Sequence, residues 1–212
     1  DQDDVWMPHK LARHARLLRE GGFDGVSSNV IAFDERDRRT LVRKDFPQRE
    51  FDYLLESPGP GSTFLLTGRL VNLVRETLLD PRGEARNVDY HDWLVYAVCR
   101  ARGWRWSIDS EPSVLYRQHD ANVMGSNVGL RSAGARLDLI RRHWHREQAT
   151  LLARLGARLA ESPQRDSLLA IEECLATRTL PHRRMLMTRV TQFRRRPRDR
   201  AVIGMLIALG IW

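Results

Sequence analysis

The sequence predicts a mixed α/β fold with a helical C-terminal region, and three observations support this prediction. Over the first 129 residues, β-rich segments alternate with amphipathic segments of helical period. The run 57–61, Ser-Pro-Gly-Pro-Gly, is the strongest break between them. Beyond about residue 129, arginine and leucine recur at helical spacing. We therefore divide the chain into an α/β segment, residues 1–129, and a helical C-terminal region, residues 130–212.

The α/β segment opens with a helix and two extended pieces. Apolar residues at helical spacing predict a helix over 6–19, and the pair Gly21-Gly22 ends it. The β-rich stretch 26–33 predicts a strand. A charged turn then leads to a second, shorter extended piece over 40–42.

Two helical segments and a strand follow the glycine- and proline-rich break. Residues 64–79 have a mostly helical period, and residues 92–102 form a compact amphipathic helix that ends at Gly103. The stretch 104–115 is typical of an extended segment. In the C-terminal region, helical periodicity covers 130–161 and 168–177.

The composition is that of a soluble globular protein. The chain has 212 residues, of which 42% are hydrophobic and 29% are charged. Cys99 and Cys174 lie far apart in no metal-ligand spacing, so we expect a reducing compartment, the cytoplasm, and no disulfide framework. The chain opens on acidic residues, without an initiator Met or the basic start of a signal peptide. We therefore expect a fragment of a longer protein.

The net charge of +8 is concentrated toward the C-terminal third and indicates an anionic partner. No zinc finger or RNP-like motif is present, so we expect no nucleic-acid partner. An arginine cluster at 194–198 precedes the apolar stretch 201–212, which is shorter than the roughly 18 residues of a membrane span.

Two interpretations of this end remain open. It contacts an anionic membrane surface peripherally, or it is a final helix that packs on the domain. In the first case, deletion of residues 194–212 would release the protein from liposomes and preserve its melting temperature.

The first candidate site is the acidic start of the chain, Asp1, Asp3 and Asp4. Carboxylates this close repel one another unless a cation or arginines share them. An Asp-x-Asp on a turn after a strand can hold a divalent ion that also binds a diphosphate. An acidic helix N-terminus explains the cluster equally well, because the helix dipole favours aspartate there.

The second candidate is Tyr90-His91-Asp92-Trp93, at the start of the helix predicted over 92–102. Asp92 there is either a helix N-cap or a partly buried base at the rim of a cleft. The third is Tyr116-Arg117-Gln118-His119, which is followed by a loop rich in Gly and Asn. Adjacent Arg and His side chains suit anion binding or metal ligation, although a surface turn also explains them.

Taken in series, these segments resemble the bacterial family 2 glycosyltransferases, in particular the rhamnosyltransferase-like members that build surface polysaccharides. The resemblance covers about residues 1–127. Its weight lies in the order of four motifs, which are Asp-Gln-Asp-Asp-x-Trp from residue 1, Gly-Ser-Thr from 61, His-Asp-Trp from 91, and Tyr-Arg-Gln-His-x-x-Asn-x-x-Gly from 116.

The resemblance implies a role for each motif residue. It identifies Asp92 as the general base and the acidic start as the metal-binding Asp-x-Asp. It implies phosphate or donor binding for Arg117 and Gly61, and an acceptor pocket shaped by His91 and Trp93. The implied metal ligands are Asp1, Asp3, Asp4 and His119.

The resemblance also implies a GT-A fold, a Mg²⁺ or Mn²⁺ ion, a dTDP- or UDP-sugar donor and a saccharide or lipid-linked saccharide acceptor. One base and one in-line displacement would invert the anomeric carbon, and rhamnose is the sugar suggested by the nearest group. The nucleotide-binding units of a GT-A fold precede the Asp-x-Asp, and this chain starts on that motif. We therefore expect an acceptor-side part that binds nucleotide-sugar poorly by itself.

Two other function classes compete with this interpretation. A catalytically inactive, basic module that binds a membrane or other proteins would explain the net charge, the arginine-rich helices and the apolar C-terminus. A hydrolase that uses the carboxylates for acid–base chemistry is the third hypothesis, but the motif series does not favour it.

Overall fold

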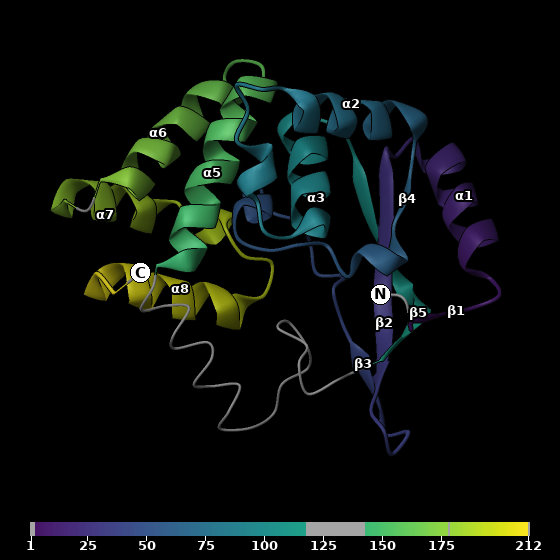
Figure 1. Ribbon diagram of the computed structural model, residues 1–212. Coiled ribbons are helices and arrows are strands. Elements are labelled where there is room, and N and C mark those ends of the chain that lie inside the picture. The colour runs from purple at the N-terminus through teal and green to yellow at the C-terminus, as the bar shows by residue number, and fades with distance from the viewer. Residues whose placement is uncertain (1–2, 118–142, 178, 212) are drawn as a thin grey trace.

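The structure is a computed structural model that describes residues 3–117, 143–177 and 179–211. Figure 1 shows a mixed sheet with helix α1 (Lys10–Gly21) on one side and helix α3 (His91–Ala101) on the other. The strand order is β1-β5-β2-β3, and β4 pairs with β2 off this path. The strands are β1 (Val5–Trp6), β2 (Gly25–Phe33), β3 (Arg39–Val42), β4 (Leu65–Leu66) and β5 (Trp106–Arg117).

β2 and β5 form the parallel centre of the sheet. Their pairing runs from Gly25 opposite Trp106 to Phe33 opposite Arg117. β3 returns antiparallel beside the end of β2, and β1 lies antiparallel to the end of β5. Because β2 and β5 run in the same direction, their carboxyl ends lie at one end of the sheet, where ligands of open α/β sheets bind.

The remaining helices continue away from the sheet on the side of α3 (Figure 1). Helix α2 (Gly68–Leu79) crosses the end of the sheet at which β2 and β5 begin. Short 3₁₀ turns join several elements, namely η1 (Asp52–Leu54), η2 (Gly61–Thr63), η3 (Ala85–Asn87) and η4 (Val190–Gln192). The C-terminal helices are α5 (Trp144–Leu159), α6 (Gln164–Ala176), α7 (Leu180–Thr188) and α8 (Pro197–Leu209).

The mixed α/β fold and the helical C-terminal region are therefore as predicted. Gly22 ends α1 in the left-handed conformation, at φ +60°, and Gly103 makes the turn from α3 to β5 at φ +76°. A residue with a side chain would be strained at either position. The two glycines thus explain why the ends of these helices were readable from sequence.

Residues before and after the predicted boundary share one hydrophobic core. Helix α3 packs against α5, and a Cβ added at Gly156 would lie 3.4 Å from the Cβ of Ala101. The boundary itself, 129–130, lies outside the described residues. The shared core includes Phe51, Trp93, Tyr96, Trp106, Leu152, Leu168, Ile171, Phe193 and Ile207.

Two boundaries differ from the sequence prediction because distant strands pair there. Val5–Trp6 is a strand opposite Leu115 and Val114, so the first helix begins only at Lys10. Leu65–Leu66 likewise pairs with the start of β2, and α2 begins at Gly68. A local periodicity cannot reveal such pairing, which depends on residues far along the chain.

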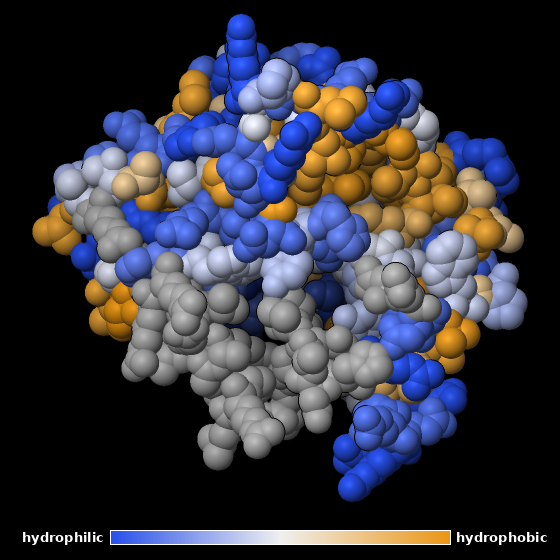
Figure 2. Space-filling model, in the orientation of Figure 1, coloured by the Kyte–Doolittle hydropathy of each residue, from blue (hydrophilic) through white to orange (hydrophobic). Residues whose placement is uncertain are grey.

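The C-terminal segment packs on the domain with one face of α8. Ile203 and Ile207 are buried, whereas Val202, Met205 and Leu209 are exposed. Figure 2 shows that a broader apolar surface lies over α2, where Val71 and Leu79 are exposed.

None of the helices within the described residues has both the length and the apolar content needed to cross a membrane.

The arginine cluster before α8 corrects one part of the membrane interpretation. The Arg195 side chain is 1% exposed and pairs with Asp52 and Glu56, so it cannot face a lipid surface. Arg196 donates to the carbonyl of Arg43 and lies over the ring of Phe46. These side chains tie the C-terminal segment to the α/β part instead.

Candidate active site

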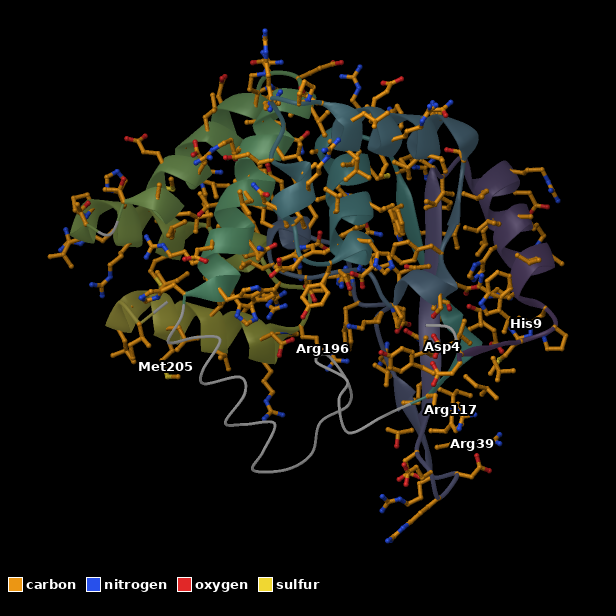
Figure 3. The ribbon with its side chains drawn as sticks, viewed as in Figure 1. Asp4, His9, Arg39, Arg117, Arg196 and Met205 are labelled. Carbon is orange, nitrogen blue, oxygen red and sulfur yellow. The ribbon has the colours of Figure 1, made fainter. Side chains whose placement is uncertain are left out.

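Two sequence-distant segments meet at the carboxyl ends of β2 and β5, and a third, the start of α3, carries the candidate base. Asp92 lies in the first turn of α3, Arg117 is the last residue of β5, and Asp4 directly precedes β1. Figure 3 shows Asp4 and Arg117 side by side at this end of the sheet. The pairing of β1 with β5 explains their closeness, because Val5 lies opposite Leu115.

Asp92 is not the N-cap of α3. Tyr90 occupies that position, and Asp92 lies within the first turn, where one carboxylate oxygen accepts a 2.8 Å hydrogen bond from the amide of Trp93. The N-cap alternative is therefore wrong. A carboxylate in the first turn still benefits from the positive end of the helix dipole.

The environment of Asp92 raises the pKa of its carboxyl group. Burial is the main cause of the rise. Four groups lower the pKa of Asp92 against it, which are, in decreasing order, the Trp93 amide, the His91 side chain, the Ser57 hydroxyl and the Lys44 ammonium. A raised pKa brings a carboxylate closer to the operating range of a general base at neutral pH. The site thus favours proton transfer over a purely structural carboxylate.

Lys44 is a site residue that the sequence analysis missed. Burial and the nearby Arg195 lower its pKa to about 8, whereas Glu56 and Asp92 favour its charged form. Lys44 therefore faces the candidate base from the chain between β3 and η1. It stands between Arg43 and Asp45 in a charged run, so the sequence carried no signal of this position.

Tyr116 lies near both the acidic start of the chain and Asp92. Burial is the largest cause that raises the pKa of its hydroxyl, and the carboxylates of Asp4, Asp92 and Asp3 raise it further. Tyr116 thus lies within electrostatic reach of both the acidic start of the chain and Asp92. The sequence analysis quoted Tyr116 in its motif but gave it no role.

Arg117 supplies a counter-charge to the acidic start of the chain. Its Nε lies 3.6 Å from Oδ2 of Asp3, and its backbone amide donates to Oδ1 of Asp4 at 3.2 Å. The guanidinium also lies 4.6 Å from the centre of the Phe33 ring. The guanidinium thus pairs with Asp3, which is one of the two ways expected to relieve the repulsion, and the backbone amide of the same residue holds Asp4.

The predicted metal ligands lie only partly within the described residues. Asp1 and His119 lie outside them. Oδ2 of Asp4 is buried and accepts no hydrogen bond from a described residue, so it has a free lone pair for a cation. No group of three metal-ligating His, Cys, Asp or Glu side chains forms within residues 3–117, 143–177 and 179–211.

The loop at 57–61 meets the start of α3. A Cβ added at Gly61 would lie 2.3 Å from Nε2 of His91, and Gly59 has a φ of +142°. Ser27 of β2 donates a 3.0 Å hydrogen bond to the carbonyl of Pro58 and ties the loop to the sheet. The glycines thus allow close approach to the helix that carries Asp92.

His91 and Trp93 have different surroundings. His91 is exposed at the amino end of α3. Trp93 is 2% exposed, and its indole donates a 2.7 Å hydrogen bond to the carbonyl of Tyr53. Trp93 can therefore shape an acceptor pocket only from the core beneath it, whereas His91 is open to direct contact.

We expect Gly61→Ala to lower the rate of transfer with little loss of stability. The added methyl group would displace the imidazole of His91, an exposed side chain that can turn away at small energetic cost. Kinetics and thermal unfolding of Gly61→Ala, His91→Ala and the double variant would test this coupling. If the two effects on rate simply add, the contact has no functional role.

One curated relative is similar to most of this chain. The dTDP-rhamnosyl transferase RfbG of Shigella flexneri is 35% identical over 153 residues, which make up 72% of this chain and 53% of the relative. The chain thus spans about half the length of the curated relative it matches. No protein-family model matches the sequence, and no solved structure matches it.

Proposed function

We propose that this chain is the acceptor-side part of a rhamnosyltransferase of the GT-A type in glycosyltransferase family 2. The observation that carries the proposal is the pairing of β1 with β5, which brings Asp3 and Asp4 beside Arg117 at the carboxyl end of the parallel strands. The similarity to a dTDP-rhamnosyl transferase supports dTDP-rhamnose as the donor. The acceptor is then a hydroxyl group of a saccharide or a lipid-linked saccharide.

Asp92 is the general base of this reaction. Its carboxylate takes the proton of the acceptor hydroxyl while the oxygen attacks the anomeric carbon of the donor. The bond from that carbon to the nucleoside diphosphate breaks, and the diphosphate leaves from the opposite face. One in-line displacement of this kind inverts the anomeric configuration. His91 and the loop at 57–61 line the side from which the acceptor approaches.

A divalent cation, Mg²⁺ or Mn²⁺, fits the donor set at the acidic start of the chain. Aspartate oxygens are the hard ligands that these ions prefer, and Oδ2 of Asp4 has no competing hydrogen bond from the described residues. The residues that would hold the ion are Asp1, Asp3, Asp4 and His119. The ion would neutralise charge on the leaving diphosphate.

Donor binding tests both the substrate and the metal. We expect calorimetry of the full-length protein to show tighter binding of dTDP-rhamnose than of UDP-glucose, and a loss of binding when a chelator removes Mn²⁺. Asp3→Ala and His119→Ala should each weaken Mn²⁺-dependent binding, since each removes an expected ligand of the ion. Glu76→Ala, at an exposed carboxylate on α2 at the opposite end of the sheet, is the matched control. Binding that is insensitive to the chelator would contradict the metal role.

The alternative of a catalytically inactive interaction module has one supporting observation. Val202, Met205 and Leu209 form an exposed apolar face on α8, which suits peripheral contact with the inner face of an anionic cytoplasmic membrane. Such contact is also compatible with an enzyme that uses a lipid-linked acceptor. We expect Met205→Glu to reduce flotation with anionic liposomes, and equal flotation of both proteins would exclude this surface as the contact.

A further inference from the structure

The arginine cluster between η4 and α8 lies against the segment that leads into the loop at 57–61. The Arg195 side chain is 1% exposed, and its guanidinium lies 3.5 Å from Asp52 and 3.2 Å from Glu56. The Arg195 guanidinium also lies 5.7 Å from the centre of the Tyr96 ring. This buried cluster uses residues that the proposed mechanism does not.

The same arginines hold the backbone of that segment. Arg194 donates a 2.7 Å hydrogen bond to the carbonyl of Leu55, and the guanidinium of Arg195 donates to the carbonyl of Ser57. The backbone amide of Arg195 donates to Glu56 at 2.6 Å. A planar guanidinium fixes the direction of its partners, which a flexible ammonium does not. The C-terminal segment therefore sets the position of residues 55–57.

The other side of residues 55–61 contacts the start of α3, which carries the candidate base. The Ser57 hydroxyl donates a 3.2 Å hydrogen bond to the carbonyl of Gly59. A Cβ added at Gly61 would lie 2.3 Å from Nε2 of His91, the residue before Asp92. A series of contacts thus runs from the C-terminal segment through the loop at 57–61 to the start of α3.

Stability alone does not explain this arrangement. Apolar side chains of similar volume are often as stabilising as a buried ion-pair cluster, because the charges lose their hydration. Buried charges are also retained where they specify one geometry. Here the specified geometry is that of a loop packed against the start of α3, which carries the candidate base.

We propose that Arg195 is a positioning residue, which holds residues 55–57 and, through them, the loop at 57–61 against the start of α3, where Asp92 lies. The proposal rests on the proposed function, since it assigns the arginine to the base of that reaction. It also gives the C-terminal segment a role in catalysis, although this segment lies far from Asp92 in the sequence.

Arg195→Lys separates positioning from simple charge balance in the full-length protein. The lysine keeps a positive charge for Asp52 and Glu56. It lacks the planar guanidinium whose second nitrogen donates a hydrogen bond to the carbonyl of Ser57. We expect its kcat to fall by about 10- to 100-fold, because a displacement on the order of 1 Å near the chemistry has that effect. The KM for the donor should stay unchanged. Arg198→Gln removes one charge from the same segment at an exposed position and should leave both constants unchanged.

Two further measurements keep the inference testable. If Arg195→Lys does not fold, Ser57→Ala removes the hydrogen bond from the Ser57 hydroxyl to the carbonyl of Gly59, leaves the buried cluster intact, and should reduce kcat in the same way. Amide NMR signals of Ser57, Gly59 and Gly61 should shift in Arg195→Lys and stay in place in Arg198→Gln.

Unchanged kcat in a folded Arg195→Lys or Ser57→Ala protein would overturn the proposal, and so would unmoved loop signals in Arg195→Lys. Failure of the proposed function has a different signature. It would appear as full transfer by Asp92→Asn, while the loop signals of Arg195→Lys would still report whether the arginine positions residues 57–61.

Discussion

Replacement of Asp92 with asparagine is expected to reduce the rate of sugar transfer by about 10²–10⁴-fold, the usual effect of losing a general base. Asparagine keeps the size of the side chain and can still accept the hydrogen bond from the Trp93 amide. It cannot take a proton from the acceptor. Affinity for the donor should therefore remain close to that of the wild type, as calorimetry would show.

The pH dependence of the wild-type enzyme gives an independent check on the same residue. A base acts in its ionised form, and burial raises the pKa of Asp92. The value of kcat/KM should therefore fall as the pH drops through this raised pKa, above the range of an ordinary aspartate. Asp89→Asn, in the turn before α3, is the matched control for both experiments, since its carboxylate instead accepts a hydrogen bond from the indole of Trp144. Near wild-type transfer by Asp92→Asn would exclude Asp92 as the base.

Replacement of Arg195 with methionine is expected to lower the free energy of unfolding by about 3–5 kcal/mol, because it leaves buried carboxylates without their partner. Asp52 is fully buried and would keep Arg100 as its charged partner, together with hydrogen bonds from the Tyr96 hydroxyl and the backbone amide of Arg49. Urea denaturation of the variant, of wild type and of Arg198→Gln would measure the difference. Arg198→Gln should unfold like the wild type.

Deletion of residues 194–212 should destabilise the domain still further. It removes Arg195 together with Ile203 and Ile207, which are 7% and 2% exposed. This expectation is the opposite of a preserved melting temperature, which the membrane interpretation of the sequence required. A cooperative transition at the wild-type melting temperature in either variant would show that the C-terminal segment is not part of the core.

Much of the candidate site was visible in the sequence because its chemistry is concentrated in short motifs. Asp92 stood between a histidine and a tryptophan, and Arg117 followed a β-rich stretch. Residue types, however, do not show which motifs meet. The meeting of Asp3 and Asp4 with Arg117 depends on the short pairing of β1 with β5, which the sequence does not reveal.

The buried charges were the least predictable part of the molecule. Arg195 lies in a run of arginines before an apolar stretch, a pattern that suits a membrane surface. Its burial depends on Asp52 and Glu56, which lie in an unrelated part of the chain. Lys44 was missed for the same reason, since an isolated lysine carries no pattern of its own.

The sequence by itself determined the order and kind of the main elements, because hydrophobic period and terminal glycines act over a few residues. The strand predicted over 26–33 and the helices predicted over 92–102 and 168–177 follow from such local patterns and correspond to β2, α3 and α6. Only the tertiary structure decided that Val5–Trp6 is a strand, that Asp92 is not an N-cap and that Arg195 is buried against Asp52 and Glu56. These features depend on contacts between residues far apart in the chain, whose energies no local window contains.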